Sequence, residues 1–184
     1  MMAAVLPFVI FAPWSAMTDA PPRRSLPDSE VMALIELLFF AYRDFVSDPD
    51  AILAGKGFGR AHHRVIHFVG RDPGMTVAQL LDLLRITKQS LSRVLKELIA
   101  KGYIYQREGA ADRRQRLLHL TDKGEALRHD LLAPQAARVR RAARELGAVG
   151  NPAFRDMLLH MISPENRPEV EGWLKRSRKP DGDG

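Results

Sequence analysis

The chain has 184 residues, a formal net charge of +6 and an isoelectric point near 10.0. This length supports one domain of moderate size with its own core, or a domain with helical extensions. With 46% hydrophobic and 27% charged residues, the composition is that of a soluble globular protein. The sequence has no cysteine, which excludes disulfides, Cys-ligated zinc or iron–sulfur sites and a thiol redox switch. The basic balance favours an anionic partner, and by itself it fits nucleic acid, the ribosome or a membrane surface.

Residues 1–16 form an apolar run, MMAAVLPFVIFAPWSA, that two prolines interrupt. The run is too short to span a bilayer as a helix, and no basic segment precedes it as in a signal peptide. We expect an upstream start in the translated sequence, with Met17 as the true start. Residues 17–27 are polar and proline-rich, so we expect residues 1–27 to be a disordered extension and linker.

Residues 28–58 predict an apolar helix followed by a loop. The helix begins near Glu30, capped by Asp28 or Ser29, and ends near Val46. Because it is apolar nearly all round, it has to be covered on more than one side. In so small a domain a second subunit is the favoured cover, and the alternative is the central helix of a monomer. We expect Asp-Pro-Asp at residues 48–50 and Gly-Lys-Gly at residues 55–57 to break the chain before the next helix.

Residues 59–71, GRAHHRVIHFVGR, predict an amphipathic helix. His63 and His67 lie four residues apart on one face, and His62 lies one position off. No carboxylate or cysteine stands nearby as a third ligand, so the pattern favours hydrogen-bonding histidines over a metal or haem site. A pH response through these histidines stays open.

The segment that follows predicts a helix-turn-helix. Thr76 and Gln79 form a capping box that opens the first helix. Thr87 caps a second helix, which closes at Gly102. One face of this second helix is apolar, and the other carries donors and small polar groups, namely Lys88, Gln89, Ser90, Ser92, Arg93 and Lys96.

The polar face of the second helix is suited to a DNA major groove. Lys88 and Lys96 are candidate phosphate contacts. Gln89, Ser90 and Arg93 are the candidates for reading base edges, because Arg suits guanine and Gln suits adenine.

A β-hairpin is expected next, with strands at residues 103–106 and 116–120 and a basic loop from Arg107 to Arg114. Residues 85–116 hold nine Lys or Arg against three Asp or Glu, a local charge equal to that of the whole chain. The positive field is therefore concentrated on one element, as expected of a nucleic-acid footprint.

Residues 122–174 predict further helices. Thr121 caps a long helix that Pro134 is expected to kink and that residues 147–150 end. Asn151 and a proline at 152 open a short apolar helix, and residues 164–176 add another. Four arginines of the long helix, at positions 138, 140, 141 and 144, are most simply a solvated face. Residues 175–184 form a charged tail that we expect to be disordered.

The combination of motifs resembles the MarR family of bacterial winged-helix regulators. The residues that carry the resemblance are Ser92-Arg93-Val94, Leu98, Lys101-Gly102-Tyr103-Ile104, Arg107, Asp112-Arg113-Arg114 and Leu120-Thr121-Asp122-Lys123-Gly124. Residues 59–71 and the following ITKQSL run further resemble the PetP-type subgroup. The resemblance, over residues 28–162, implies an interlocked homodimer of terminal helices with two winged helices.

The family resemblance also implies roles for individual residues. The resemblance places Arg113 at the tip of the wing, in the minor groove that flanks the major-groove site. It also implies that Asp112 braces the wing by pairing with Arg114 or Arg107. Arg116 completes the basic residues of the hairpin. A small, commonly aromatic effector is implied between the dimerisation helices and the winged domain; the residues carried over to that cleft are Phe39, Tyr42, Arg43, His62 and Ile66.

Catalytic patterns are absent from the sequence: it has no P-loop, nucleophile elbow or HExxH motif. We therefore expect no enzyme, no cofactor and no metal. The expected fold is mainly α with a small β-hairpin wing, divided into residues 28–58 and 122–174 for dimerisation and 59–121 for DNA binding. The expected function is a cytoplasmic, homodimeric, sequence-specific regulator of transcription on a pseudo-palindromic operator. The alternative is a nucleoid-type protein that binds nucleic acid without sequence preference.

Overall fold

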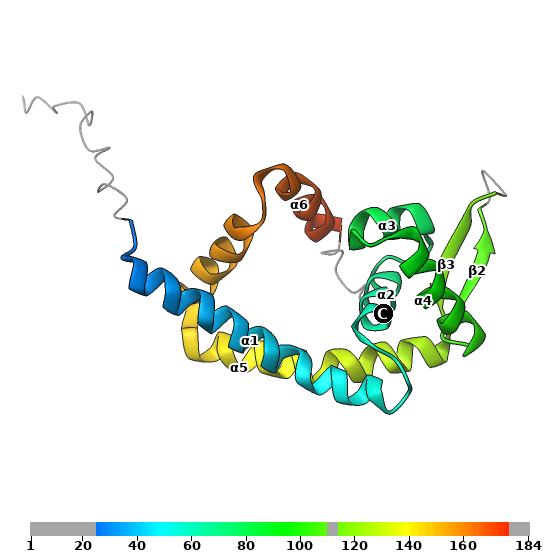
Figure 1. The fold of residues 1–184 in the computed structure, drawn as a ribbon, viewed down its shortest axis with the longest axis horizontal. Coiled ribbons are helices and arrows are strands. Elements are labelled where there is room, and N and C mark those ends of the chain that lie inside the picture. Colours follow the sequence, from blue (N-terminus) through cyan, green and yellow to red (C-terminus); the bar gives the residue numbers. More distant parts are fainter. Residues whose placement is uncertain (1–24, 110–113, 177–184) are drawn as a thin grey trace, which may run out of the picture. The chain divides into compact units, whose positions relative to one another are not determined.

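The computed structural model describes residues 25–109 and 114–176 (Figure 1). Its elements are α1 (Asp28–Ala54), α2 (Arg60–Arg71), β1 (Met75–Thr76), α3 (Val77–Leu84), α4 (Lys88–Ala100), β2 (Ile104–Glu108), β3 (Arg116–Leu120), α5 (Asp122–Met161), the 3₁₀ helix η1 (Pro164–Asn166) and α6 (Arg167–Arg176). The expected fold, mainly α with a small β wing, is confirmed. The chain divides into two compact units inside α1, between Phe39 and Phe40.

Helix α1 is longer than the sequence predicted, because it continues through Pro49 to Ala54. A proline has no N–H to give the carbonyl four residues earlier, which here belongs to Phe45. Gln135 of α5 replaces the missing donor, with its side-chain Nε2 donating to the Phe45 carbonyl at 3.3 Å. Gln135 is the buried polar side chain of the described core. The expected break at residues 48–50 was wrong because this long-range bond was not visible in the local sequence.

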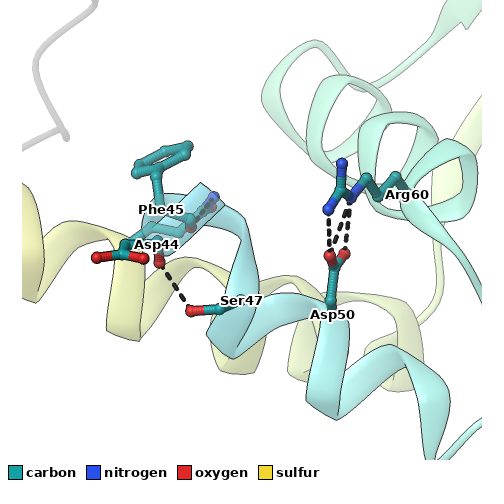
Figure 2. Close-up of polar contacts among 6 residues, drawn as sticks. Asp44, Phe45, Ser47, Asp50 and Arg60 are labelled. Carbon is teal, nitrogen blue, oxygen red and sulfur yellow. Dashed lines mark hydrogen bonds and ion pairs between the residues drawn. The ribbon is translucent and has the colours of Figure 1, made fainter. Parts of the chain in front are cut away.

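The end of α1 is also tied to the start of α2. Arg60 donates from Nε and Nη2 to Asp50 Oδ2, at 2.9 and 2.7 Å. Figure 2 shows this fork of the Arg60 guanidinium facing the Asp50 carboxylate, and beside it the Ser47 hydroxyl donating to the Asp44 carbonyl. The hydrogen bond from Arg60 to Asp50 raises the pKa of that guanidinium. Arg60 therefore stays charged while it joins the two helices.

Helix α2 is the centre of the core of the second unit. It packs against α3, α4, α5 and β3. Val65, Ile66 and Val69 are fully buried on its inner face, beside residues such as Leu91 of α4 and Leu131 of α5. The period of the apolar residues in 59–71 had predicted this inner face.

The caps of the helix-turn-helix are those predicted. Thr76 Oγ1 accepts from the Gln79 amide at 3.2 Å, and Gln79 Oε1 accepts from the Thr76 amide at 2.8 Å. Thr87 Oγ1 accepts from the Ser90 amide at 3.2 Å and opens α4. At the other end Gly102 takes φ +73°, so that the Tyr103 amide reaches the Leu98 carbonyl at 2.9 Å. This is the left-handed turn that glycine permits after a helix.

The sheet has three antiparallel strands in the order β1–β3–β2, one more than the predicted hairpin. In β1, Met75 pairs with Leu118 and Thr76 with Leu117. A two-residue strand is too short to show an alternating pattern, and its Thr76 doubles as a helix cap. The predicted second strand has the observed bounds, whereas β2 begins one residue later and extends to Glu108.

Two motifs of the family resemblance, at residues 101–104 and 120–124, contact one another. After the Lys101-Gly102 turn, the Tyr103 carbonyl accepts from the Thr121 amide at 3.1 Å. Thr121 Oγ1 donates to the Gly102 carbonyl at 2.7 Å. A Cβ on Gly124 would overlap the Tyr103 carbonyl oxygen, so this position admits only glycine without a shift of the backbone. The two motifs thus fasten the end of α4 to the start of α5.

In helix α5 one predicted feature is confirmed and two are wrong. The backbone torsions leave the helical region at Gly147, with φ 69° and ψ −172°, within residues 147–150, where the sequence predicted the long helix to end; they stay helical at Pro134, where a kink was expected. Asn151 does not cap a new helix, since its Nδ2 donates back to the Ala143 carbonyl at 3.1 Å. Arg138, expected on a solvated face, pairs with Asp48 at 3.2 Å, and the other three arginines of that set are exposed.

The described ranges, 25–109 and 114–176, leave the expectations for residues 1–24 and 177–184 untested, including Met17 as a start. Within those ranges, no helix is long and apolar enough to cross a bilayer. Nor do they contain a group of three His, Cys, Asp or Glu side chains arranged to hold a metal ion.

Candidate nucleic-acid interface and adjoining cavity

The outer face of α4 presents the side chains that the sequence predicted for DNA contact. Thr87, Lys88, Gln89, Ser90, Ser92, Arg93 and Lys96 are all exposed, whereas Leu91, Val94, Leu95 and Leu98 are buried. In the described part of the chain, Lys88, Gln89, Arg93 and Lys96 have no intramolecular hydrogen bond or ion pair. Their donors are thus available to a ligand.

Two of the predicted contact residues are already engaged at the start of α4. The Thr87 hydroxyl donates to Ser90 Oγ at 2.9 Å and also accepts from the Ser90 amide. These bonds hold the first turn of the helix, as expected of an N-cap. Thr87 therefore positions the exposed polar face of α4, and Ser90 contributes to the same cap.

A groove separates the outer face of α4 from β2. It has a volume of about 550 Å³ and is lined by Val77, Lys88, Ser92, Leu95, Lys96, Ile99, Ala100 and Gln106. Figure 1 shows β2 and β3 side by side as a hairpin next to α4. Helix face and hairpin thus lie on one side of the winged domain, where one duplex can reach both.

The wing carries basic side chains on its exposed strands. Arg107 lies 5.3 Å from the centre of the Tyr105 ring, and Arg116 Nη1 donates to Glu108 Oε1 at 2.8 Å. Arg114 is exposed and has interactions of its own. Asp112 and Arg113 lie outside the described residues, so the predicted bracing of the wing and its minor-groove contact remain expectations.

From the inner side, α4 is held by His62 of α2. His62 Nδ1 accepts from the Gly59 amide at 3.1 Å, and Nε2 lies 2.9 Å from Glu97 Oε2 of α4. Because Nδ1 accepts, the proton of the neutral ring is on Nε2, which donates to Glu97. The ring also stacks on Phe58 at 4.6 Å between centroids. The sequence assigned His62 to an effector site, whereas the structure shows it bonded to the recognition helix.

A cavity of about 400 Å³ lies between α2 and the facing parts of α1 and α5. It is lined by Tyr42, Phe45, Val46, Arg60, His63, Arg64, His67, Phe68 and Gln135. Apolar rings form much of its wall, and two guanidinium groups and two imidazoles of α2 add polar atoms. A volume of this size holds a small molecule.

The surroundings of both histidines in the cavity disfavour their charged form and lower their pKa. Burial, together with the nearby His63, Arg128 and Arg71, lowers the pKa of His67 from 6.5 to about 4. Burial also lowers the pKa of His63, although the Asp50 carboxylate opposes this shift. The cause is the cost of placing a further charge in a partly buried, already cationic region.

Of the five residues predicted for an effector, the structure places Tyr42 on the cavity wall. Ile66 is fully buried in the core, and Arg43 pairs with Asp44 at 2.9 Å. Phe39 belongs to the other compact unit. The polar lining of α2 was missed, although Arg60, His63, Arg64 and His67 follow one helix face at intervals of three and four residues. That spacing was the available signal.

A winged helix-turn-helix with an exposed basic recognition helix is the fold of a class of DNA-binding regulators. Sequence comparison identifies the family within that class. Residues 56–115 match the model of the MarR family. The HTH-type transcriptional regulator PetP of Rhodobacter capsulatus is 47% identical over 155 residues, which cover 83% of this chain and 93% of that protein. The chain belongs to the MarR family and is a helix-turn-helix transcriptional regulator, not an enzyme. The resemblance inferred from the sequence motifs is confirmed.

Solved structures share the fold. Streptococcus pneumoniae FabT in complex with DNA is 22% identical and superposes with a TM-score of 0.64, over 71% of this chain and 94% of that one. A MarR variant from E. coli complexed with operator DNA is 20% identical, with a TM-score of 0.55, over 76% of this chain and all of that one (100%). At these identities the likeness concerns the fold.

Proposed function

We propose that the protein is a homodimeric, sequence-specific DNA-binding regulator that acts on a pseudo-palindromic operator in the cytoplasm and responds to a small effector. The single observation that carries the proposal is the outer face of α4, whose polar side chains are exposed and, in the described chain, largely unengaged. Two relatives of the same fold were solved with DNA, which supports a duplex as the partner.

In the proposed complex α4 enters the major groove. Lys88 and Lys96 contact phosphates, and Gln89 and Arg93 read base edges. Arg107, Arg114 and Arg116 approach the flanking backbone from the wing, and Arg113 enters the minor groove, where narrow A·T-rich tracts attract arginine. Asp112 braces the wing.

The proposed dimer is supported by apolar side chains that each protomer leaves exposed. In the second unit these are Phe40, Tyr42, Leu132, Val139, Leu146, Val149, Phe154, Met157, Leu158 and Met161, and in the first unit Val31, Leu34, Leu38 and Phe39. Exposed apolar surface on this scale marks an interaction site. Residues 28–58 and 122–174 thus serve dimerisation, and a two-fold dimer presents two copies of α4 to half-sites about one helical turn apart.

The proposed effector site is the cavity that Tyr42 shares with α2. Arg64 is not ion-paired in the described chain, although its Nη2 donates to the Leu84 carbonyl at 2.6 Å, so its positive charge favours an anionic ligand; Phe45 and Phe68 favour an aromatic one. Phe39, Arg43, His62 and Ile66 remain proposed members of the effector-responsive region. His62 reaches α4 directly, so a ligand-driven shift of α2 would be transmitted to the recognition helix through Glu97.

Selection of bound duplexes from a random pool tests the DNA-binding proposal. The full-length protein is expected to enrich an inverted repeat with half-site centres about 10 base pairs apart. Arg93→Ala is expected to lose one or more defined bases of that motif. Arg140→Ala, an exposed arginine of α5, is the matched control and is expected to return the full motif. Enrichment of no motif would favour the nucleoid-type alternative.

Titration with benzoate tests the effector site. Binding is expected to weaken in Arg64→Gln and to be unchanged in Arg140→Gln. Benzoate binding that is equal in both variants would place any ligand elsewhere.

A further inference from the structure

The C-terminal segment of the second unit reaches the helix-turn-helix. Figure 1 shows α6 ending beside α3. Arg85, directly after α3, donates from Nη2 to Asn166 Oδ1 at 2.8 Å and to Glu169 Oε2 at 3.3 Å. One side chain of the DNA-binding motif is thus bonded to both η1 and α6.

The residue that makes these bonds occupies a special backbone position. Arg85 has φ 49° and ψ 47°, and it is the one non-glycine residue with positive φ in the described chain. A side chain is disfavoured in this left-handed region, so the surrounding structure has to hold it there. Arg85 stands two residues before Thr87, the cap of the recognition helix. The torsions at Arg85 therefore set the direction in which α4 leaves α3.

The C-terminal segment is fixed on both sides of the Arg85 contact. Before it, Arg167 donates to the Ile162 carbonyl at 2.9 Å and to the His160 carbonyl at 2.7 Å, joining α6 to the end of α5. After it, Trp173 meets Phe68 of α2 edge to face, with centroids 5.5 Å apart. Asn166 and Glu169 are thus presented to Arg85 from a segment anchored at two points.

The contact between α6 and α3 is nevertheless incomplete. A cavity of about 190 Å³ lies at this seam, with Gln79, Asp82 and Leu83 of α3 on one side and Glu169, Trp173 and Arg176 of α6 on the other. Among the described residues, the bonds from Arg85 to Asn166 and Glu169 are the side-chain hydrogen bonds that join η1 and α6 to the α3–α4 turn.

We propose that the segment from η1 to α6 positions the recognition helix by holding Arg85, with Glu169 and Asn166 as positioning residues. The proposal rests on the proposed function, since it concerns the helix that reads DNA. Movement of the C-terminal helices would then change the α3–α4 turn and the fit of α4 to the groove, without any contact of α6 with DNA.

Amide hydrogen exchange by NMR in the full-length, DNA-free protein tests the contact. The reporters are the Arg85 amide, which donates to the Leu81 carbonyl at 2.9 Å, and the Ser90 amide, which donates to Thr87 Oγ1. The test variant is Glu169→Gln. The matched control is Glu171→Gln, on the same helix but outside the Arg85 contact.

In Glu169→Gln, exchange at both reporters is expected to accelerate about two- to five-fold, the range that an exposed ion pair supports. Affinity for a selected operator is expected to fall by a similar factor. Glu171→Gln is expected to match the wild type in both measurements. The charge-reversed pair, Arg85→Glu with Glu169→Arg, is expected to restore slow exchange, which a merely structural loss would not do.

Unchanged exchange in Glu169→Gln, or equal acceleration in Glu171→Gln, would overturn the proposal. Tighter operator binding by Glu169→Gln would also overturn it, because the contact would then be inhibitory. The exchange measurement needs no DNA, so it decides on the contact separately from the selection experiment that decides on the proposed function.

Discussion

Helix α1 passes through Pro49 because Gln135 supplies the missing donor, and this predicts a specific coupling between the two positions. Replacing Gln135 with leucine keeps the approximate volume but leaves the Phe45 carbonyl without its partner. Gln135 is only 8% exposed, so water does not readily take its place. An unsatisfied buried acceptor costs about 1–3 kcal/mol. Because the bond is 3.3 Å long, we expect a loss of about 1–2 kcal/mol in the free energy of unfolding.

The coupling is visible in a double-mutant cycle. In Pro49→Ala, the new amide at position 49 can donate to the Phe45 carbonyl within the helix. Gln135→Leu is then expected to cost about 0.5 kcal/mol or less, so the two substitutions should be non-additive by about 1 kcal/mol. Urea unfolding followed by circular dichroism measures all four proteins, at one protein concentration because dimerisation affects apparent stability. An equal cost of Gln135→Leu in both backgrounds would refute this explanation of the continuous helix.

Three further predictions concern packing, pH and the cap of α4. Gly124→Ala places a Cβ against the Tyr103 carbonyl and is expected to destabilise the fold by about 1–3 kcal/mol or more in urea unfolding; a neutral result would contradict the close approach. In the folded protein the pKa of His67 is lowered to about 4, whereas in the unfolded chain it is 6.5. The contribution of His67 to the free energy of unfolding is therefore complete above pH 6.5, and it is lost as the pH falls from there towards 4. Stability should therefore fall by about 2–3 kcal/mol more over this window in the wild type than in His67→Gln, and parallel curves would exclude the neutral, buried histidine. Thr87→Ala removes the acceptor for the Ser90 amide and is expected to cost about 1 kcal/mol of stability, whereas Thr87→Ser should retain most of it.

The features predicted correctly from the sequence are those that depend on residues close together in the chain. The caps at Thr76, Thr87 and Thr121 and the glycine stop at Gly102 depend on residues at most five positions apart, and all four are observed. The exposed face of α4 followed from helical periodicity in the same way.

What the sequence could not give depends on contacts distant in the chain. The passage of α1 through Pro49 needs a donor from α5, and β1 exists only because β3 lies beside it. The contact of His62 with Glu97 could not be predicted because Glu97 lies 35 residues away on another helix. Helical spacing alone places the cavity residues of α2 on one face. Which neighbouring helices cover that face and form the cavity depends on the tertiary fold.

The central claim is that α4 reads sequence in DNA, and the most direct measurement is a ratio of affinities. Binding of the full-length protein to the inverted repeat enriched in the selection experiment is compared with binding to a scrambled duplex of equal length, at two salt concentrations. The account predicts a preference of about 10³-fold or more, reduced about ten-fold or more in Arg93→Ala and kept in Arg140→Ala. Equal binding of both duplexes, weakening together as salt rises, would contradict it, because only phosphate contacts would then remain.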